Sequence, residues 1–280
     1  MDNKKHPKFI SWFLNKPKTT GFITFLFLSY VVGFLVYQQY QLIKEDEQRE
    51  MNSILHIVNQ NLEQSLKNCY TTTLTLALTI NDKGVPENFD YVGKKLMESN
   101  NSISAVQLVP NGVIKYIYPL EGNEAAINLN ILTTPHLKEE ALKSVASQKM
   151  YFAGPLKLKQ GGMGIVGRFP VYRNNKFWGF SAVIIKLNDL LRSSGINTVD
   201  DSKYYFQFSK ENITTKKEIF YLPNKSDFSK KYNISTIIPD GDWKLYLISK
   251  HQNYFYAQIL IPGIIGLILA ALFGVLIYTL

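Results

Sequence analysis

Two long apolar segments without charged residues lie near the ends of the chain. The first covers residues 19–43, with its apolar centre at residues 21–37, and the second covers residues 257–280. A helix of about 20 apolar residues crosses the roughly 30 Å hydrocarbon layer of a membrane. We therefore predict two transmembrane helices, at residues 21–40 and 257–280.

A cleaved signal peptide is the alternative for the first segment. Such a peptide has an apolar region of about 7–15 residues followed by small residues at a cleavage site. Here the apolar run is longer and Tyr37-Gln-Gln-Tyr40 follows it, which favours an uncleaved anchor. In the second segment Gly266, Ala270 and Gly274 share one helix face. That face either packs closely against another helix or reflects ordinary membrane-helix composition.

A long amphipathic helix is predicted after the first apolar segment. Residues 38–80 contain neither glycine nor proline. Apolar side chains recur there at three- and four-residue steps, at Met51, Ile54, Leu55, Val58, Leu62, Leu66 and Cys69. This spacing forms one stripe on a helix. The stripe either pairs with a second subunit or packs on its own domain, and both readings stay open. Residues 81–84 end the helix.

A β-hairpin and two helices are predicted next. A short helix is expected at residues 89–98. The β-rich runs at residues 103–109 and 113–118 flank a Pro-Asn-Gly turn, a sequence typical of a hairpin. Thr134 and Pro135 suit the cap and first turn of a helix that runs to about residue 148.

The remaining outer segment is a series of short strands. Three β-rich runs follow the helix, at residues 151–159, 164–172 and 176–187, with turns at residues 160–162 and 174–175. Asn188 and Asp189 are expected to cap a short helix. A second, smaller sheet is expected from runs near residues 204–208, 219–222, 234–238 and 243–249. Strands that alternate with few helices predict an α+β fold with two PAS-like antiparallel sheets.

Charge sets the predicted orientation in the membrane. The first twenty residues carry five lysines against Asp2 alone, within a net charge of +9. Short basic flanks stay in the cytoplasm, so residues 41–255 are predicted to be extracytoplasmic or periplasmic in a multi-pass protein of the cell (inner) membrane. The other lysines are scattered, without an arginine-rich stripe, which argues against nucleic-acid binding.

No catalytic, cofactor or metal motif is recognised. Cys69 is the single cysteine and the four histidines share no ligand spacing, so neither a disulfide within the chain nor a two-cysteine metal site is possible. Residues 162–167 match G-x-G-x-x-G literally, but a nucleotide-binding loop needs a helix after it, and a β-rich run follows here. We expect no cofactor, no metal and no catalytic residues in this segment.

Three ordered blocks resemble the CHASE domain, the extracytoplasmic sensor of bacterial receptor kinases and cyclases and of plant cytokinin receptors. The blocks read QLVPNGVIKYIYPLEGNEAAINLNIL from residue 107, FAGPLKLKQGGMGIVGRFPVY from residue 152 and KFWGFSAVIIKLNDLL from residue 176. The resemblance implies a stalk helix with two PAS-like subdomains and a small-molecule ligand in the distal one. It also implies a homodimer coupled to a histidine kinase or to a cyclic-dinucleotide enzyme.

The candidate ligand-binding residues come from these blocks. Plant members hold adenine through an acidic residue after the first hairpin, where this chain has Glu121 and Glu124. They carry a small hydroxyl residue where this chain has Ala153, a departure that argues against cytokinin. Arg168 is the best single candidate, because an arginine between apolar neighbours often meets a carboxylate or phosphate. The full set is Tyr116, Tyr118, Glu121, Asn123, Glu124, Phe152, Ala153, Gly154 and Arg168. Each also has a structural role as its alternative, in the core, a solvated loop or a salt bridge.

The predicted organisation joins these parts into the sensor half of a receptor. Its segments are a basic cytoplasmic N-terminus, a first membrane helix, a stalk with a connecting helix, a distal core, a membrane-proximal subdomain and a second membrane helix, at residues 1–20, 21–40, 41–99, 100–195, 196–255 and 257–280. We expect the intact gene product to continue into a cytoplasmic output domain, as in a sensor histidine kinase. The alternatives are a diguanylate cyclase or phosphodiesterase, or a stand-alone membrane-tethered binding protein.

Overall fold

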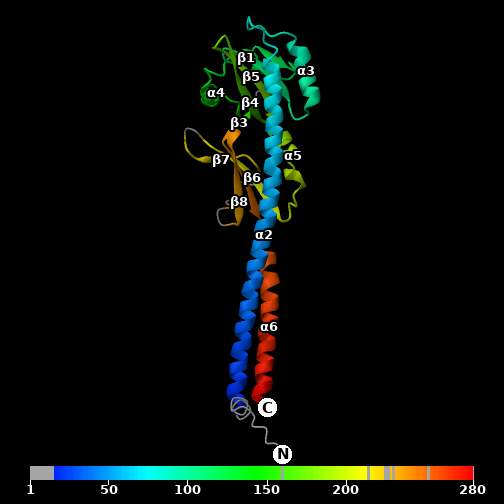
Figure 1. Ribbon diagram of the computed structural model, residues 1–280, viewed down its shortest axis with the longest axis vertical. Coiled ribbons are helices and arrows are strands. Elements are labelled where there is room, and N and C mark those ends of the chain that lie inside the picture. The colour runs from blue at the N-terminus through cyan, green and yellow to red at the C-terminus, as the bar shows by residue number, and fades with distance from the viewer. Residues whose placement is uncertain are drawn as a thin grey trace, which may run out of the picture. The chain divides into compact units, whose positions relative to one another are not determined.

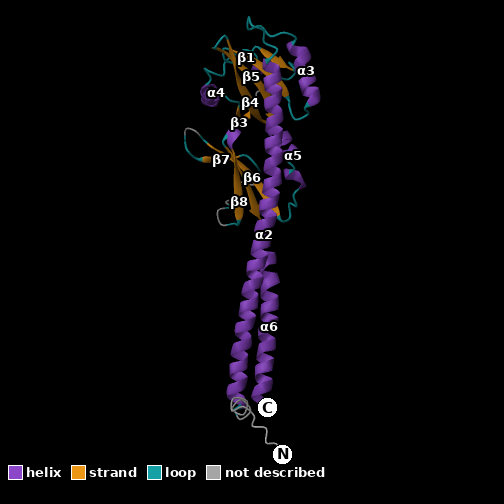
Figure 2. Ribbon diagram, in the orientation of Figure 1, coloured by secondary structure: helices purple, strands orange, loops and turns teal. Residues whose placement is uncertain are grey.

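The computed structural model describes residues 16–158, 161–212, 215–223, 228, 231–250 and 253–279. The chain forms two compact units, one from Met1–Asn52 with Lys250–Leu280 and one from Ser53–Ser249. The lysines before residue 16 and the start of the expected turn at residues 160–162 lie outside the described residues. Figures 1 and 2 show the course of the chain and its secondary structure.

The first unit is a pair of helices. Helix α2 (Pro17–Ala77) and helix α6 (Asn253–Thr279) are both long and apolar enough to cross a membrane. A methyl group added at Gly266 would lie 2.9 Å from the Val32 side chain, and one at Gly274 would lie 2.9 Å from the Cβ of Phe25. The small-residue face of α6 therefore packs closely against the start of α2, and the first of the two interpretations of that face is confirmed.

Helix α2 also enters the second unit, where its apolar stripe is buried. Leu55, Val58, Leu62, Leu66 and Cys69 are each at most 6% exposed. Hydrogen bonds fix the helix against both ends of the domain. The Ser181 hydroxyl donates to the Thr73 carbonyl at 2.7 Å, and the Asn61 amide donates to the Ser194 carbonyl at 3.1 Å. The stripe thus packs on its own domain.

The distal sheet has five antiparallel strands in the order β2-β1-β5-β4-β3. Its strands are β1 (Ala105–Pro110), β2 (Tyr116–Tyr118), β3 (Tyr151–Lys157), β4 (Met163–Arg173) and β5 (Lys176–Lys186). The hairpin turns use left-handed residues, with φ of 52° at Asn111 and 82° at Gly112, and of 51° at Asn174 and 60° at Asn175. Asparagine and glycine adopt this conformation readily, so the turn sequences fix the hairpins as predicted.

Three helices accompany this sheet: α3 (Phe89–Ser99), α4 (Pro135–Ser147) and α5 (Leu187–Ser193). Thr134 is the cap residue of α4, but its hydroxyl donates to the Asn130 carbonyl at 2.6 Å instead of capping the helix. Helix α5 begins at Leu187 with Lys186 as its cap residue. The predicted cap at Asn188 is therefore wrong, because the helix starts directly where β5 ends.

The two faces of the distal sheet are covered differently. On one face Phe169 meets Tyr70 of α2, with ring centroids 5.7 Å apart. On the other face α4 supplies Leu137 and Ala141 to a core that includes Val109, Phe180, Ala182 and Ile184. Successive side chains of a strand point to opposite faces. Arg168, next to Phe169 on β4, therefore lies on the α4 face.

The second sheet has four antiparallel strands in the order β7-β6-β9-β8. They are β6 (Tyr204–Glu211), β7 (Glu218–Phe220), β8 (Asn233–Ile238) and β9 (Trp243–Ser249), and the 3-10 turn η3 (Pro239–Gly241) joins the last two. The predicted α+β class with two antiparallel sheets is confirmed. Residues 163–173 form a strand, so the glycine pattern at residues 162–167 is part of a hairpin and not a phosphate-binding loop.

Candidate functional site

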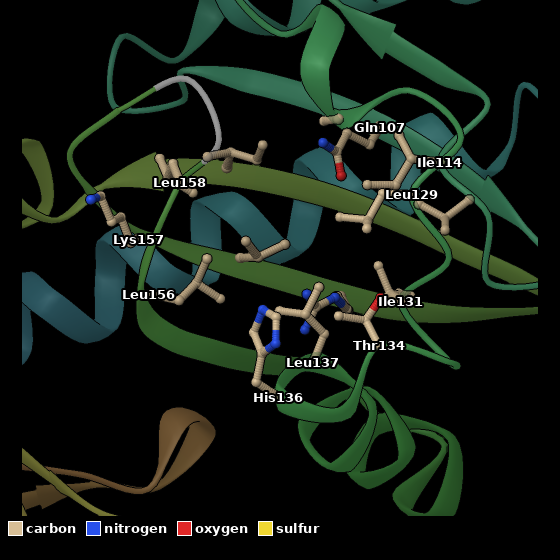
Figure 3. A pocket seen from close by; sticks show the side chains of 15 residues that line it. Gln107, Ile114, Leu129, Ile131, Thr134, His136, Leu137, Leu156, Lys157 and Leu158 are labelled. Atoms are coloured by element: carbon tan, nitrogen blue, oxygen red, sulfur yellow. The ribbon is translucent and has the colours of Figure 1, made fainter.

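A cavity of about 110 Å³ lies on the α4 face of the distal sheet, and we call it the distal cavity. Figure 3 shows its lining. The apolar lining residues are Val109, Ile114, Ala126, Leu129, Ile131, Leu137, Leu156, Leu158, Val166 and Ile184. The polar and basic ones are Gln107, Thr134, His136, Lys157 and Arg168. A small, mostly apolar cavity with a few polar groups is typical of a small-molecule site.

Strand register places the two polar groups of the cavity floor. Gln107 on β1 pairs with Ala182 on β5, and Ala182 pairs with Arg168 on β4. The three residues therefore share one row across the sheet, with Gln107 and Arg168 about 10 Å apart between their Cα atoms. Gln107 and Arg168 are both only 4% exposed. Two long polar side chains thus rise from an apolar sheet face.

Arg168 is a buried cation with one unsatisfied donor. Its Nη1 atom is enclosed and has no hydrogen-bond partner among the described residues. Burial lowers the pKa of Arg168 to about 10, against the opposing influence of Glu140 and Tyr151. The side chain is therefore still charged at neutral pH. A buried charge is costly, so an anionic ligand at this position would stabilise the folded chain.

The rest of the polar lining divides between floor and rim. Figure 3 shows the Gln107 amide pointing into the cavity. His136 and Lys157 are exposed residues of the lining and form the rim. The rim thus adds two basic groups outside a floor that already holds the Arg168 charge. A field of one sign attracts ligands of the opposite sign.

The two predicted tyrosines lie away from the cavity. Tyr116 meets Phe89 of α3 with ring centroids 5.7 Å apart, and Tyr118 lies against Gly93 of the same helix. Only Ile117 between them joins the core on the cavity side. Both tyrosines thus pack under α3, on the opposite face of the sheet from Arg168.

The predicted polar loop also lies outside the lining. Glu121 and Glu124 are exposed, and the Gly122 amide donates to the Glu124 carboxylate at 3.2 Å. Asn123 is buried and its amide donates to the Pro119 carbonyl at 2.9 Å, while its Oδ1 atom has no partner. Ala126, two residues beyond Glu124, does line the cavity. The loop therefore borders the cavity through its apolar end.

The last three candidates belong to the contact between the two sheets. Phe152 is buried against Trp243 with ring centroids 6.2 Å apart, and Ala153 is fully buried. The Gly154 amide donates to the Glu140 carboxylate at 3.0 Å, and the Gly154 carbonyl accepts from the Trp243 indole at 2.7 Å. Of the predicted site residues, only Arg168 lines the distal cavity.

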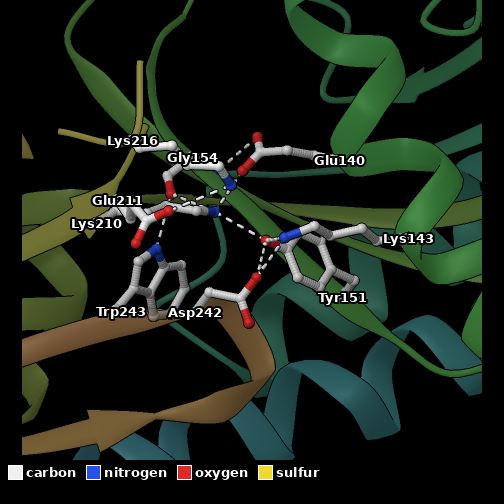
Figure 4. A network of polar contacts seen from close by, with 9 residues as sticks. All are labelled: Glu140, Lys143, Tyr151, Gly154, Lys210, Glu211, Lys216, Asp242 and Trp243. Carbon is white, nitrogen blue, oxygen red and sulfur yellow. Dashed lines mark hydrogen bonds and ion pairs between the residues drawn. The ribbon is translucent and has the colours of Figure 1, made fainter. Parts of the chain in front are cut away.

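A set of polar side chains joins the distal sheet and α4 to the second sheet, and we call it the junction cluster (Figure 4). It consists of Glu140, Lys143, Tyr151, Lys210 and Asp242. Lys210 of β6 forms an ion pair with Glu140 of α4 and donates to the Tyr151 hydroxyl at 3.0 Å. Asp242 accepts from the Tyr151 hydroxyl at 3.0 Å and pairs with Lys143 at 2.5 Å.

Burial makes the centre of this cluster energetically important. The side chains of Lys210 and Glu140 are 6% and 12% exposed. Burial lowers the pKa of Lys210, and the carboxylate of Glu140 opposes that shift. Burial also raises the pKa of the Tyr151 hydroxyl, which keeps it a neutral donor. A buried pair of this kind is strongly destabilised when one partner is removed.

The distal cavity and the junction cluster share their supporting elements. Helix α4 supplies His136 and Leu137 to the cavity and Glu140 to the cluster. Strand β3 supplies Leu156 to the cavity and Tyr151 to the cluster, and Tyr151 pairs directly with Arg168 across the sheet. A change at Arg168 in the cavity therefore acts directly on Tyr151, which belongs to the contact between the sheets.

A second, open groove of about 650 Å³ lies beside α2. It is lined by Glu63, Leu66, Lys67, Tyr70, Gln148, Lys149, Met150, Phe152, Phe169, Ile238, Pro239 and Asp240. None of these described residues has a buried polar atom without a partner. Across the described part of the chain, no group of three or more His, Cys, Asp or Glu side chains is placed to hold a metal ion. The distal cavity is therefore the better candidate for a ligand site.

Sequence reasoning missed most of the distal cavity and the junction cluster. Gln107 had a usable signal, since a polar residue interrupts the apolar run AVQLV as Arg168 interrupts VGRFP. His136 and Lys157 carry no such mark. Lys210 lies on β6, 70 residues beyond Glu140, and Asp242 lies in the turn before β9, 91 residues beyond Tyr151. Only the fold brings these residues together.

The comparisons with known proteins agree with this architecture. The family model of the CHASE domain matches residues 99–221. No curated protein matches the chain in sequence. The ligand-binding domain of the Pseudomonas aeruginosa amino acid chemoreceptor PctB, in complex with L-Arg, is similar in structure. It has a TM-score of 0.58 and 14% identity, over 76% of this chain and 98% of that chain.

Two further solved structures have the same arrangement. An extracellular ligand-binding receptor from Desulfohalobium retbaense gives a TM-score of 0.55 at 15% identity. The match covers 71% of this chain but only 40% of the length of that receptor chain. The sensory domain of the Campylobacter jejuni chemoreceptor Tlp3 gives 0.53 at 12% identity, over 77% of this chain and 98% of that chain. At such identities the likeness shows the PAS-like sensor fold alone.

Proposed function

We propose, from the premise that residues 99–221 form a CHASE domain, that this chain is the ligand-sensing input part of a transmembrane receptor. The observation that carries the proposal is the distal cavity, whose floor holds the buried guanidinium of Arg168 with its Nη1 atom unsatisfied by any described residue. A fold that keeps such a buried donor unsatisfied is suited to receive an acceptor from a ligand. The PctB ligand-binding domain, a solved structure similar to this chain, is in complex with an amino acid, L-Arg.

The proposed location follows from the two membrane spans. Helices α2 and α6 each contain a segment with the length and composition of a transmembrane helix. The lysine-rich N-terminus is assigned to the cytoplasm by the preference of basic flanks for that side. The residues between the spans, including the CHASE domain, then face the outside of the cell or inner membrane.

Signal transmission is proposed to run through the junction cluster. A ligand drives a conformational change only by the difference between its affinities for the two states. A ligand bound to Arg168 changes the charge next to Tyr151 and displaces α4, which carries both cavity residues and Glu140. The second sheet senses this shift through Lys210, and its strand β9 ends at Ser249, four residues before α6 begins at Asn253.

The output partner is proposed to be a histidine kinase. A diguanylate cyclase or phosphodiesterase is the alternative output, and a stand-alone tethered binding protein is the second alternative. Phosphorylation of the intact gene product by labelled ATP in membranes supports the kinase. Synthesis of a cyclic dinucleotide from GTP under the same conditions supports the cyclase and rejects the kinase.

A homodimer is proposed as the working assembly. Tyr70 and Leu74 near the end of α2 and Leu78 in the turn that follows it recur every four residues, and they are 40%, 39% and 76% exposed. Such an exposed apolar row suits pairing with the same helix of a second copy. Replacement of Leu74 by glutamate is expected to convert dimers to monomers in light scattering of the detergent-solubilised chain. A wild-type monomer contradicts the dimer.

Ligand screening on the full chain tests the proposed function. Thermal unfolding in nanodiscs is measured with small acids, amides, amines, amino acids and nucleobases. A ligand at 100 times its Kd stabilises by about 2.7 kcal/mol, which raises Tm by roughly 5–10 °C for a protein of this size. The shift must disappear in Ala126→Leu, which fills the distal cavity. Hits that survive in this variant, or no hits at all, reject the site.

A further inference from the structure

The distal cavity has cations and apolar walls but no acidic lining residue among the described ones. Its basic groups are Arg168 at the buried floor and His136 and Lys157 at the rim, and its other charged or polar lining residues are Gln107 and Thr134 alone. The walls come from ten aliphatic side chains. The chemistry of the lining therefore selects both for a negative charge and for an apolar body.

Building on the proposed function, we infer that the ligand of the distal cavity is a small monocarboxylate with an aliphatic body and no ammonium group. The carboxylate lies at the floor, where the Arg168 guanidinium donates to both oxygens. The Gln107 amide, which points into the cavity, supplies a further donor. Guanidinium and carboxylate match in shape and form paired, charge-assisted hydrogen bonds.

The missing acid argues against a zwitterionic amino acid. An ammonium group buried in this cavity would find no carboxylate among the described lining residues. A buried charge without a partner is strongly disfavoured. The same argument rejects amines, which would in addition be repelled by Arg168. A neutral amide brings no negative charge to the guanidinium and would bind less tightly than the matching acid.

The size of the cavity limits the length of the acid. Its volume of about 110 Å³ corresponds to about four molecules of liquid water. An acid of roughly four carbons fits this space, and the aliphatic walls replace water around its chain. Phosphate esters and dicarboxylates carry a second charge, for which the described floor of the cavity has no second cation.

Three matched probes test the ligand class on the full chain in nanodiscs: butanoate, butanamide and L-2-aminobutanoate. Isothermal titration is expected to show butanoate binding, with the other two at least about 10-fold weaker. Arg168→Met should weaken butanoate about 10- to 100-fold, as loss of charge-assisted hydrogen bonds does, and should change the affinity for the uncharged butanamide by a clearly smaller factor. Arg192→Met, at an exposed arginine, is the control and should leave all affinities unchanged.

The outcomes separate the ligand class from the function. Equal or tighter binding of butanamide or L-2-aminobutanoate, abolished by Ala126→Leu, overturns the monocarboxylate and keeps the sensor. Unchanged butanoate binding in Arg168→Met also overturns it. If none of the three probes binds, but a library compound binds and Ala126→Leu abolishes that binding, the monocarboxylate is again overturned and the sensor function is kept. Absence of any hit that depends on the cavity overturns the function itself. The probe comparison needs no variant, so it stays decisive if Arg168→Met fails to fold.

Discussion

The Arg168 side chain should destabilise the folded, ligand-free chain and strengthen the binding of an anionic ligand. Its charge is buried beside apolar side chains, and burial lowers its pKa to about 10. A pKa lowered by burial means that the charged form is less stable in the folded chain than in water. At neutral pH the folded state therefore bears this cost, which the Glu140 carboxylate offsets only in part.

Arg168→Met should accordingly stabilise the ligand-free chain. We expect a gain on the order of 1–3 kcal/mol in the free energy of unfolding, since methionine fills a similar volume without a charge. Urea unfolding of the second unit within the full chain measures this gain. Arg192→Met removes an arginine side chain that is 72% exposed and should change stability by less than about 0.5 kcal/mol. A destabilised Arg168→Met would mean that the guanidinium already has a partner.

At the scale of elements, helix α2 owes its position to a narrow buried stripe. Leu62 is 1% exposed, whereas Leu74 on the same helix is 39% exposed. Removal of a buried leucine loses its transfer energy and leaves a cavity. Leu62→Ala should therefore cost about 2–4 kcal/mol, and Leu74→Ala much less. Urea denaturation compares the two. Similar losses would show that α2 is held by its polar contacts rather than by the stripe.

The junction cluster couples α4 to strand β6 through the ion pair of Glu140 and Lys210. Lys210→Met removes the ion-pair partner of the buried Glu140 carboxylate and should cost about 3–5 kcal/mol. Glu140→Gln in the same chain should restore part of that loss, so the double-mutant cycle gives a coupling energy above about 1 kcal/mol. Unfolding of the four chains in urea measures it.

The exposed pair of Lys95 and Glu98 provides the matched control for this cycle. Its side chains are 57% and 49% exposed at an N–O distance of 2.8 Å, and such surface pairs contribute about 0–1 kcal/mol. The corresponding cycle with Lys95→Met and Glu98→Gln should thus show little coupling. An equally small coupling in the junction cluster would remove it as the route between the sheets.

For the whole molecule, the predicted topology places the residues between the two candidate membrane helices outside the cell membrane. Burial raises the pKa of the single thiol, Cys69, to about 12, so the native chain should resist maleimide at pH 7. A cysteine introduced at exposed Glu124 should react with a membrane-impermeant maleimide added to intact cells. One introduced at exposed Lys16 should react only after lysis. The reverse pattern would place the sensor in the cytoplasm.

Local sequence determined much of this protein. Apolar run length set the two candidate membrane helices, three- and four-residue spacing set the stripe of α2, and the Asn-Gly and Asn-Asn pairs set the hairpin turns. These features depend on residues close together along the chain, so backbone preferences and hydrophobic periodicity are enough to predict them. Arg168 was found in the same way, as a charge between apolar neighbours on a strand.

Tertiary structure alone decided which residues meet. Register across β1, β5 and β4 brought Gln107 into one row with Arg168, while Tyr116 and Tyr118 turned to the opposite face under α3. Packing of the two sheets brought Lys210 to Glu140 across 70 residues. A shift of one residue in register moves every side chain to the other face, so such contacts follow from the assembled sheet and not from any local pattern.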